Sequence, residues 1–341
     1  MWYNYIVRSI NVAIGGFMPI INTDEVLSVT LYTGEQGQES CICKCPCCSQ
    51  SVKGNHYHGT ESQIDEFFEK LPSLEQVYIL GNPDPAVDPD FCNLVAHKAI
   101  NRGIHVSFCT SGVGGKKTLQ RLLDGLEPSM VDYVSFSIDS TSQERMSMLK
   151  GIYYPWDYAV EGICWAIKNG YTVKVQPTLW SSNYLDAGGI IDYFAPMGVK
   201  WFTFHIGSLE SGIKLPTHRH LRASEISLVH DHIDDAVKKH PGIKVRCPII
   251  YPTCGDDDKN KYYCMYTHRC KELLVTFAKD GIMCTHAPIA SSYDSNCIFK
   301  LGEVAEVAEY QVSGYCPLGG KLVGNKDTIT YCRFVSKMWN Y

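Results

Sequence analysis

The sequence alternates six times between short runs typical of β-strands and longer runs with apolar residues at helical spacing. The first strand run, residues 26–33, reads Val-Leu-Ser-Val-Thr-Leu-Tyr-Thr. The predicted strands are 26–33, 76–80, 104–109, 132–138, 171–179 and 200–206, and the predicted helices are 64–71, 89–101, 116–126, 156–169, 185–197 and 224–239. Strands joined by helix-length connections favour right-handed parallel units in an α/β fold. This periodicity alone is compatible with a flat, doubly wound sheet or with a partial barrel.

Composition limits the classes of protein to consider. The 341 residues are 45% hydrophobic and 20% charged, with a formal net charge of −5, which argues against broad nucleic-acid binding. Residues 1–21 lack the pattern of a signal peptide, and no run approaches the roughly 18 apolar residues of a membrane span. Sixteen cysteines without a secretion signal indicate a cytoplasmic protein that uses thiols for metal ligation.

Five cysteines lie within eight residues, directly after the first predicted strand. Three of them, Cys41, Cys45 and Cys48, have C-x3-C-x2-C spacing. Three thiolates on a short loop leave one iron of a 4Fe-4S cluster without a protein ligand, open to a small chelating molecule. A structural zinc site or buried apolar cysteines are the alternatives. A second register from Cys43 lacks its third member, since Gln50 stands at that position.

This spacing resembles the signature of the radical S-adenosylmethionine (SAM) enzymes. The resemblance implies a partial (β/α)6 barrel, with the cysteine loop at the mouth formed by the C-terminal strand ends. It also implies that SAM binds the open iron and is cleaved reductively to a 5′-deoxyadenosyl radical, which removes a hydrogen atom from the substrate. One departure from the family pattern is Cys47, which stands where an aromatic residue usually precedes the third ligand.

The resemblance further implies that polar residues at the later strand ends hold SAM. The loop after the second strand departs from the family's Gly-Gly-Glu-Pro-like sequence and reads Gly-Asn-Pro-Asp-Pro. Buried strand-end polar groups that bond only to the protein are the competing interpretation. The candidate SAM-binding residues are Gly81, Asn82, Asp84, Thr110, Ser111, Ser137, Asp139, Gln176 and His205.

Cysteines return in the second half of the sequence. We expect a leader at 1–25, the barrel at 26–242 and a small cysteine-rich α+β domain at 243–341. Residues 270–284 read as strand, Asp-Gly hairpin turn and strand. This part resembles a SPASM or twitch extension, which implies one auxiliary 4Fe-4S cluster, although zinc or buried cysteines stay open. The expected ligands are Cys270, Cys284, Cys316 and Cys332, with Cys254 and Cys264 as substitutes.

Residues for the substrate chemistry are less sharply marked. His218, Arg219 and His220 follow the sixth strand and can bind an anionic substrate or relay protons, or can form a solvated loop. A spare thiol, Cys254 or Cys297, can return a hydrogen atom to the substrate.

The expected partners are a small-molecule substrate (a nucleoside, sugar or amino-acid derivative) and an external one-electron donor of the flavodoxin or ferredoxin type. About 25 residues precede the first strand, too few for a winged-helix domain that binds a leader peptide. The net reaction stays open between oxidation, rearrangement, decarboxylation and sulfur insertion. The alternatives are a peptide-modifying epimerase or cross-linking enzyme and, in another class, a non-catalytic zinc or iron-sulfur protein.

Overall fold

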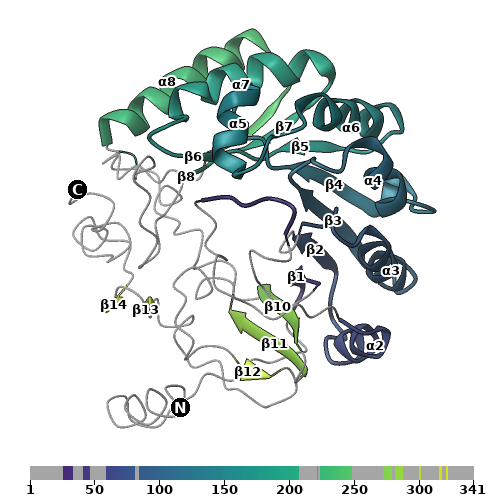
Figure 1. Cartoon of the computed structure of the whole chain (residues 1–341). Helices are drawn as coiled ribbons and strands as arrows, with labels where there is room; N and C mark the ends of the chain where they lie inside the picture. The colour runs from purple at the N-terminus through teal and green to yellow at the C-terminus, as the bar shows by residue number, and fades with distance from the viewer. Residues whose placement is uncertain are drawn as a thin grey trace.

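A ten-stranded sheet forms the framework of the chain, with the strand order β12-β11-β10-β1-β2-β3-β4-β5-β7-β9 (Figure 1). The structure, a computed structural model, describes residues 26–33, 41–46, 59–80, 84–206, 221, 223–247, 272–278, 281–286, 299–300, 315–316 and 320–321. The strands of the sheet are β1 (Ser28–Tyr32), β2 (Gln76–Leu80), β3 (His105–Thr110), β4 (Val131–Phe136), β5 (Val173–Val175), β7 (Trp201–Thr203), β9 (Lys244–Arg246), β10 (Glu272–Ala278), β11 (Gly281–His286) and β12 (Phe299–Lys300). Two further pairs are β6 (Thr178–Leu179) with β8 (His205–Ile206), and β13 (Tyr315–Cys316) with β14 (Gly320–Lys321).

Every pairing from β10 through β1 to β9 is parallel. From β1 to β5 each strand lies beside the one that precedes it in the sequence. A doubly wound sheet reverses its order at a switch point, whereas a barrel does not. The strand order therefore indicates a partial barrel and not a doubly wound sheet.

Helices cover the outer side of this curved sheet (Figure 1). They are α2 (Glu61–Glu69), α3 (Pro89–Ile100), α4 (Gly115–Leu122), α6 (Trp156–Lys168), α7 (Ala187–Phe194) and α8 (Ala223–Lys239), with short 3₁₀ turns at Pro128–Met130, Tyr184–Asp186 and Ala195–Met197. Helix α5 (Gln143–Lys150) lies instead at the strand ends, where its last residue contacts the cysteine loop. Local sequence explains the starts of the helices: Thr60 and Gln63 form a capping box before α2, and Asp88 caps α3 ahead of Pro89.

The two faces of the sheet differ in chemistry. Toward the helices, Val77, Phe108 and Phe136 are fully buried in the hydrophobic core. Because side chains alternate along a strand, the neighbouring positions face the concave side, where Ser107 and Ser135 lie. The barrel interior is thus partly polar, unlike a sheet face that is packed only as hydrophobic core.

All six predicted strand segments and all six predicted helices are present, with small shifts at their ends. The segment 171–179 is divided into β5 and β6, and 200–206 into β7 and β8. Pro177 lies at the first of these breaks and has no N–H for a ladder, while its carbonyl oxygen accepts from His205 N at 2.8 Å.

Two parts of the fold differ from the expectation. Helix α5 was not predicted, and neither was β9, which continues the parallel sheet past residue 242. The expected strands around the Asp-Gly turn are present as β10 and β11, which pair antiparallel, and β10 joins β1 in parallel. The sheet therefore continues across the boundary expected at residue 242.

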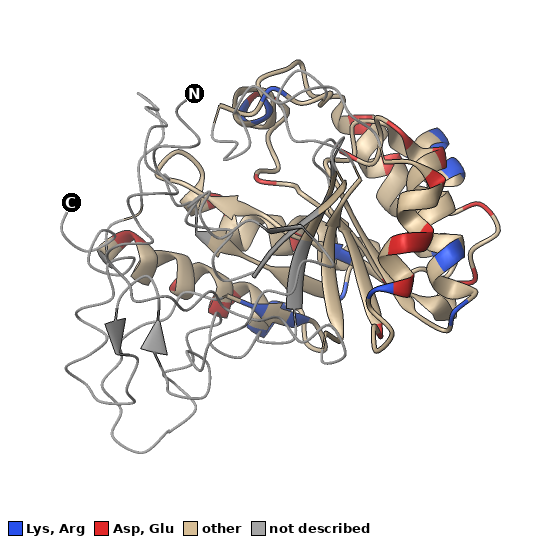
Figure 2. Ribbon diagram, turned by 90° about the horizontal axis from the view of Figure 1, so that it is seen from below, with Lys and Arg blue, Asp and Glu red and all other residues tan. Residues whose placement is uncertain are grey.

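Charged residues lie mainly on the helices, and the strands are largely uncharged (Figure 2). Acidic and basic positions are interspersed on the helical layer, as expected for a net charge of −5. Among the described residues, no helix combines the length and the hydrophobicity needed to cross a bilayer.

Candidate active site at the mouth of the barrel

The cysteine loop is held against the C-terminal end of α5. Lys44 N donates to Lys150 O at 2.8 Å, and Lys44 Nζ donates to Cys41 O at 2.9 Å. Along this loop Ile42 and Lys44 are exposed, whereas Cys43 is buried and Cys41 and Cys45 are half-buried. The three thiols therefore share the more buried side of the loop.

Hydrogen bonding among these thiols favours thiolates at the predicted ligands. A hydrogen bond with Cys43 lowers the pKa of Cys41 to about 7, with burial opposing it and the main-chain N–H of Asp84 assisting. Cys43 also lowers the pKa of Cys45 through a hydrogen bond, and the Lys150 ammonium contributes to this shift. The pKa of Cys43 itself is raised in return. Thiolates are the form that ligates iron. Within the described residues no three His, Cys, Asp or Glu side chains form a complete metal site, and Cys48 lies outside them.

Asp84, Thr110 and Ser111 are brought together beside this loop. The Asp84 carboxylate accepts from Thr110 Oγ1 at 2.8 Å, from Ser111 N at 2.6 Å and from Ala86 N at 2.9 Å. All three predicted residues are buried. Asp84 therefore joins the loop after β2 to the end of β3 and, through its main chain, to Cys41.

A buried ion pair lies on the other side of the cysteine loop. Lys150 Nζ contacts Asp139 Oδ2 at 2.7 Å and donates to Ser137 Oγ at 2.8 Å, with the Lys150 and Asp139 side chains only 6% and 8% exposed. Burial would lower the pKa of Lys150, but Asp139 and the Cys45 thiol hold that pKa well above its usual value. This cation beside the cluster loop was missed in the sequence, where nothing local distinguishes it from a surface lysine.

Asp139 also holds the neighbouring strand. Its Oδ1 accepts from Thr178 N at 2.7 Å, and its carbonyl oxygen accepts from Asn183 Nδ2 at 2.7 Å. Of the predicted SAM-binding residues, Ser137 and Asp139 are thus joined in one network with Lys150.

Gln176 follows β5, in the break before β6, and His205 lies on β8. Gln176 Oε1 accepts from Ser135 Oγ at 3.2 Å and from Tyr78 Oη at 3.4 Å. His205 begins β8 and pairs with Thr178. The predicted SAM-binding residues at or just after the ends of β3, β4 and β5 therefore lie at the C-terminal side of three neighbouring strands.

One atom at this site directly supports a bound ligand. Ser111 Oγ is buried and has no hydrogen-bond partner among the residues that the structure describes. Buried hydroxyls are normally bonded, so this atom fits a polar group from outside the described part of the chain. The donor set fits SAM, since thiolates suit an iron-sulfur cluster and hydroxyls suit a ribose, amino or carboxylate group.

Several predicted residues lie outside the described residues. They are Cys48, Gly81, Asn82, His218, Arg219, His220, Cys254, Cys264, Cys270, Cys297 and Cys332. Cys284 lies on β11, opposite Val275 on one side and Phe299 on the other, and Cys316 lies on β13. The auxiliary cluster and its ligands remain predictions.

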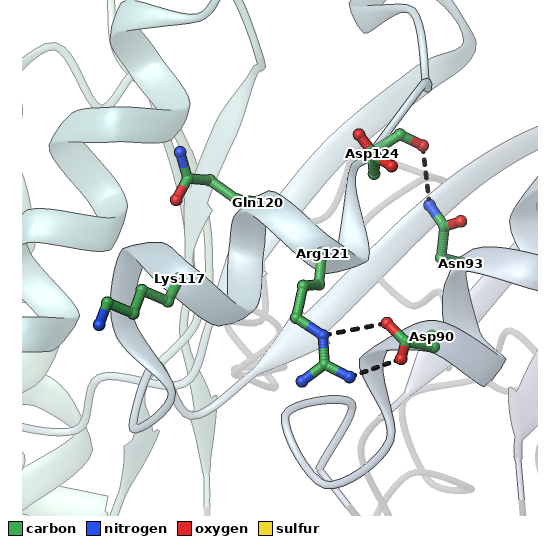
Figure 3. A pocket seen from close by; sticks show the side chains of 6 residues that line it. All are labelled: Asp90, Asn93, Lys117, Gln120, Arg121 and Asp124. Carbon is green, nitrogen blue, oxygen red and sulfur yellow. Dashed lines mark hydrogen bonds and ion pairs between the residues drawn. The ribbon is translucent and has the colours of Figure 1, made fainter.

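A separate hollow of about 550 Å³ lies between α3 and α4 in the helical layer (Figure 3). Two of its charged groups are engaged with each other, because Arg121 Nε donates to Asp90 Oδ1 at 3.0 Å and Arg121 Nη2 to Asp90 Oδ2 at 2.5 Å. Asn93 Nδ2 donates to Asp124 O at 3.0 Å. The chemistry-bearing residues thus belong to the barrel mouth and not to this hollow.

A family model described as the Radical SAM superfamily matches residues 37–186, the segment from the cysteine loop through the Lys150–Asp139 pair to the start of α7. Residues 37–186 therefore form a radical SAM domain. The family implies SAM and a 4Fe-4S cluster as the cofactors of this domain. No curated protein matches the chain in sequence.

Solved structures of radical SAM enzymes share the fold. Streptococcus suis SuiB bound to S-adenosylmethionine has a TM-score of 0.58 at 13% identity, over 74% of this chain and 58% of SuiB. SuiB bound to precursor peptide SuiA has the same TM-score and identity, over 75% and 58%. The enzyme anSMEcpe with bound AdoMet and a peptide has a TM-score of 0.52 at 15% identity, over 66% and 64%. The chain spans less than two thirds of the length of these proteins.

Proposed function

We propose that the protein is a radical SAM enzyme that holds its 4Fe-4S cluster on Cys41, Cys45 and Cys48 and abstracts a hydrogen atom from a polar organic substrate. The observation that carries the proposal is the position of the low-pKa thiols of Cys41 and Cys45 beside the strand ends of a parallel barrel. Reductive cleavage of SAM at the cluster supplies the 5′-deoxyadenosyl radical. The protein's part is to orient both molecules and to exclude water.

Residues around the cysteine loop would hold SAM by its polar groups. Ser111 offers a buried hydroxyl, and Asp84 fixes its position by accepting from the Ser111 N–H and from Thr110 Oγ1. The buried Lys150 ammonium, next to Ser137, is suited to a carboxylate because a cation in a dry site binds anions strongly. Gln176 is the candidate for the ribose hydroxyls.

The polar concave face supports a small hydrogen-bonding substrate such as a nucleoside, sugar or amino-acid derivative. Hydroxyl and amide groups of Ser107, Ser135 and Gln176 point to this side of the sheet. A peptide is the second candidate, because SuiB and anSMEcpe, which share the fold, were both solved with peptides. Incubating the reconstituted enzyme with a cell extract depleted of either small molecules or peptides separates the two, since only one fraction should stimulate SAM cleavage.

The remaining parts of the proposal concern the electron supply and the second half of the chain. An external flavodoxin- or ferredoxin-type protein would reduce the cluster, and the cysteines beyond residue 250 would hold one auxiliary 4Fe-4S cluster. A cytoplasmic location suits this chemistry, since reduced thiols persist there.

Anaerobic reconstitution with iron and sulfide, followed by reduction with dithionite, tests the enzyme function. The wild type should convert SAM to 5′-deoxyadenosine and methionine. Cys41→Ala, Cys45→Ala and Cys48→Ala should abolish the conversion, and Cys47→Ala should retain it. Wild-type protein that takes up iron without cleaving SAM would overturn the proposal, and loss of the cluster in Cys47→Ala would overturn the ligand assignment.

Iron analysis separates the cluster hypotheses. Two 4Fe-4S clusters bind about eight iron atoms per chain, and one binds about four. A count near eight that falls to about four in a Cys284→Ala, Cys316→Ala double variant supports the auxiliary cluster. A count near four in the wild type removes it, and zinc in place of iron favours a structural zinc site.

A further inference from the structure

Strand β3 carries a thiol on its concave face, with a serine two residues before it and another two residues after it. Ser107 and Cys109 lie on the same side of β3, whereas Phe108 points into the helical core, and Ser111 directly follows the strand. Cys109 pairs with Leu80 on β2 and Ser135 on β4, and it is 7% exposed. The thiol therefore lies within the barrel, near the C-terminal end where radical SAM cofactors act.

Both serines beside it have unbonded hydroxyls. Ser107 Oγ and Ser111 Oγ are buried and have no partner among the described residues. The two orphan groups lie on either side of Cys109, on a face that leads to the SAM-binding strand ends. Because buried polar groups are normally satisfied, their position indicates a polar ligand on this face of β3.

Tyr78 fixes the Cys109 thiol from the neighbouring strand. Its hydroxyl donates to Gln176 Oε1 at 3.4 Å and lies close enough to the Cys109 thiol to lower the pKa of that thiol. Burial raises the pKa of Cys109, with the Tyr78 bond only partly offsetting it, and burial also raises the pKa of Tyr78. Both groups therefore keep their hydrogens at neutral pH, in contrast to the acidified thiols of the cluster loop.

We propose that Cys109 is the hydrogen-atom donor that quenches the substrate radical, and that Tyr78 positions it. The Cys109 S–H bond breaks and a C–H bond forms on the substrate carbon, leaving a thiyl radical on Cys109. One electron from the external one-electron donor and one proton from solvent restore the thiol. The net change at the substrate is then redox-neutral, as in an epimerisation. This inference rests on the proposed function and places the donor within the described barrel, in contrast to Cys254 and Cys297.

The first experiment needs no substrate. Reconstituted enzyme is given SAM and dithionite in D₂O, where the Cys109 thiol exchanges to S–D and lies open to the site. We expect deuterium in the 5′-deoxyadenosine, and loss of most of it in Cys109→Ala and Cys109→Ser, with the exposed Cys164→Ala variant as the matched control. Unchanged deuterium in both Cys109 variants overturns the inference. No 5′-deoxyadenosine at all in the wild type defeats the proposed function instead.

The second experiment uses apo protein and alkylation by iodoacetamide, read by peptide mass spectrometry. Tyr78→Phe removes the bond that lowers the pKa of Cys109, so labelling of Cys109 should slow several-fold while labelling of Cys164 is unchanged. In iron-loaded protein, S-adenosylhomocysteine should protect Cys109 several-fold and leave Cys164 unaffected. Equal labelling with and without this probe would mean that Cys109 does not face the cofactor site, which also overturns the inference.

Discussion

The main-chain N–H of Lys44 donates to the carbonyl oxygen of Lys150 at 2.8 Å, which fixes the cysteine loop to the end of α5. The helix ends there because Gly151 adopts a left-handed conformation with φ of 65°. A Cβ atom at Gly151 would overlap the Lys44 carbonyl oxygen. The close approach of helix and loop thus depends on a residue without a side chain.

Gly151→Ala should therefore displace the cysteine loop and reduce iron uptake. The left-handed conformation alone costs a non-glycine residue roughly 1–2 kcal/mol. Gly103→Ala is the matched control, because Gly103 also has a left-handed φ of 76° but a Cβ atom there would meet open space. Iron per chain after reconstitution is the measurement. Equal iron in both variants would show that the contact with Lys44 does not hold the loop.

Single substitutions in the buried Lys150–Asp139 pair should destabilise the protein much more than the double substitution. Removing one charge leaves the other buried and unpaired, which costs about 3–5 kcal/mol, whereas removing both costs much less. Lys150→Met and Asp139→Asn should each lower the free energy of unfolding, and the double variant should recover much of the loss. Asparagine keeps an oxygen for Thr178 N, so the comparison isolates the charge.

The pH dependence of this coupling follows from the raised pKa of Lys150. Its stabilising charge is present below the usual pKa of about 10.4 and is lost only as pH rises through the higher folded-state value. The coupling energy from denaturant titrations should therefore be constant from pH 6 to about pH 9. A coupling that disappears in this range would contradict a charged Lys150.

Asp84→Asn should weaken SAM binding without unfolding the barrel. The amide can still accept from Thr110 and Ala86 through its oxygen, but its NH₂ group would face the Ser111 N–H. One lost buried hydrogen bond corresponds to roughly tenfold in affinity. Equilibrium dialysis with iron-loaded protein measures this effect, and Thr110→Ser, which keeps the hydroxyl, should bind SAM like the wild type. An unchanged affinity for SAM in Asp84→Asn would show that Asp84 does not contribute to the cofactor site.

Much of this fold could be predicted from the sequence because its signals are local. Alternating strand and helix periodicities marked each unit of the barrel, and the cysteine spacing marked the cluster loop. Helix α5 was missed because only Met146, Leu149 and Lys150 are buried along it, so its periodicity is weak, although Ser142 and Gly151 are good cap residues at its ends.

The roles of buried polar residues could not be predicted in the same way. The role of Lys150 depends on its ion pair with Asp139, and the role of Cys109 depends on Tyr78 of the neighbouring strand. Both interactions form only after the strands have assembled. Thr110 and Ser111 were expected at the site from their place after a strand, but their shared bond to Asp84 depends on the β2–β3 pairing. Contacts between elements are not encoded by spacing within one element.

Asn183 should be essential to the strand ends beyond Asp139, although no sequence motif contains it. It is 1% exposed, its Nδ2 donates to Asp139 O and Thr178 O, and its Oδ1 accepts from Trp180 N at 2.6 Å. Asn183→Ala removes two buried hydrogen bonds, to Asp139 O and Trp180 N, and a part-buried one to Thr178 O, and should cost at least about 2 kcal/mol of unfolding free energy. The exposed Asn169→Ala, which removes a single bond to Trp165 O, should cost under about 1 kcal/mol. Equal losses in the two variants, measured by urea denaturation, would mean that the Asn183 network is replaced by water and does not hold β6 against β4.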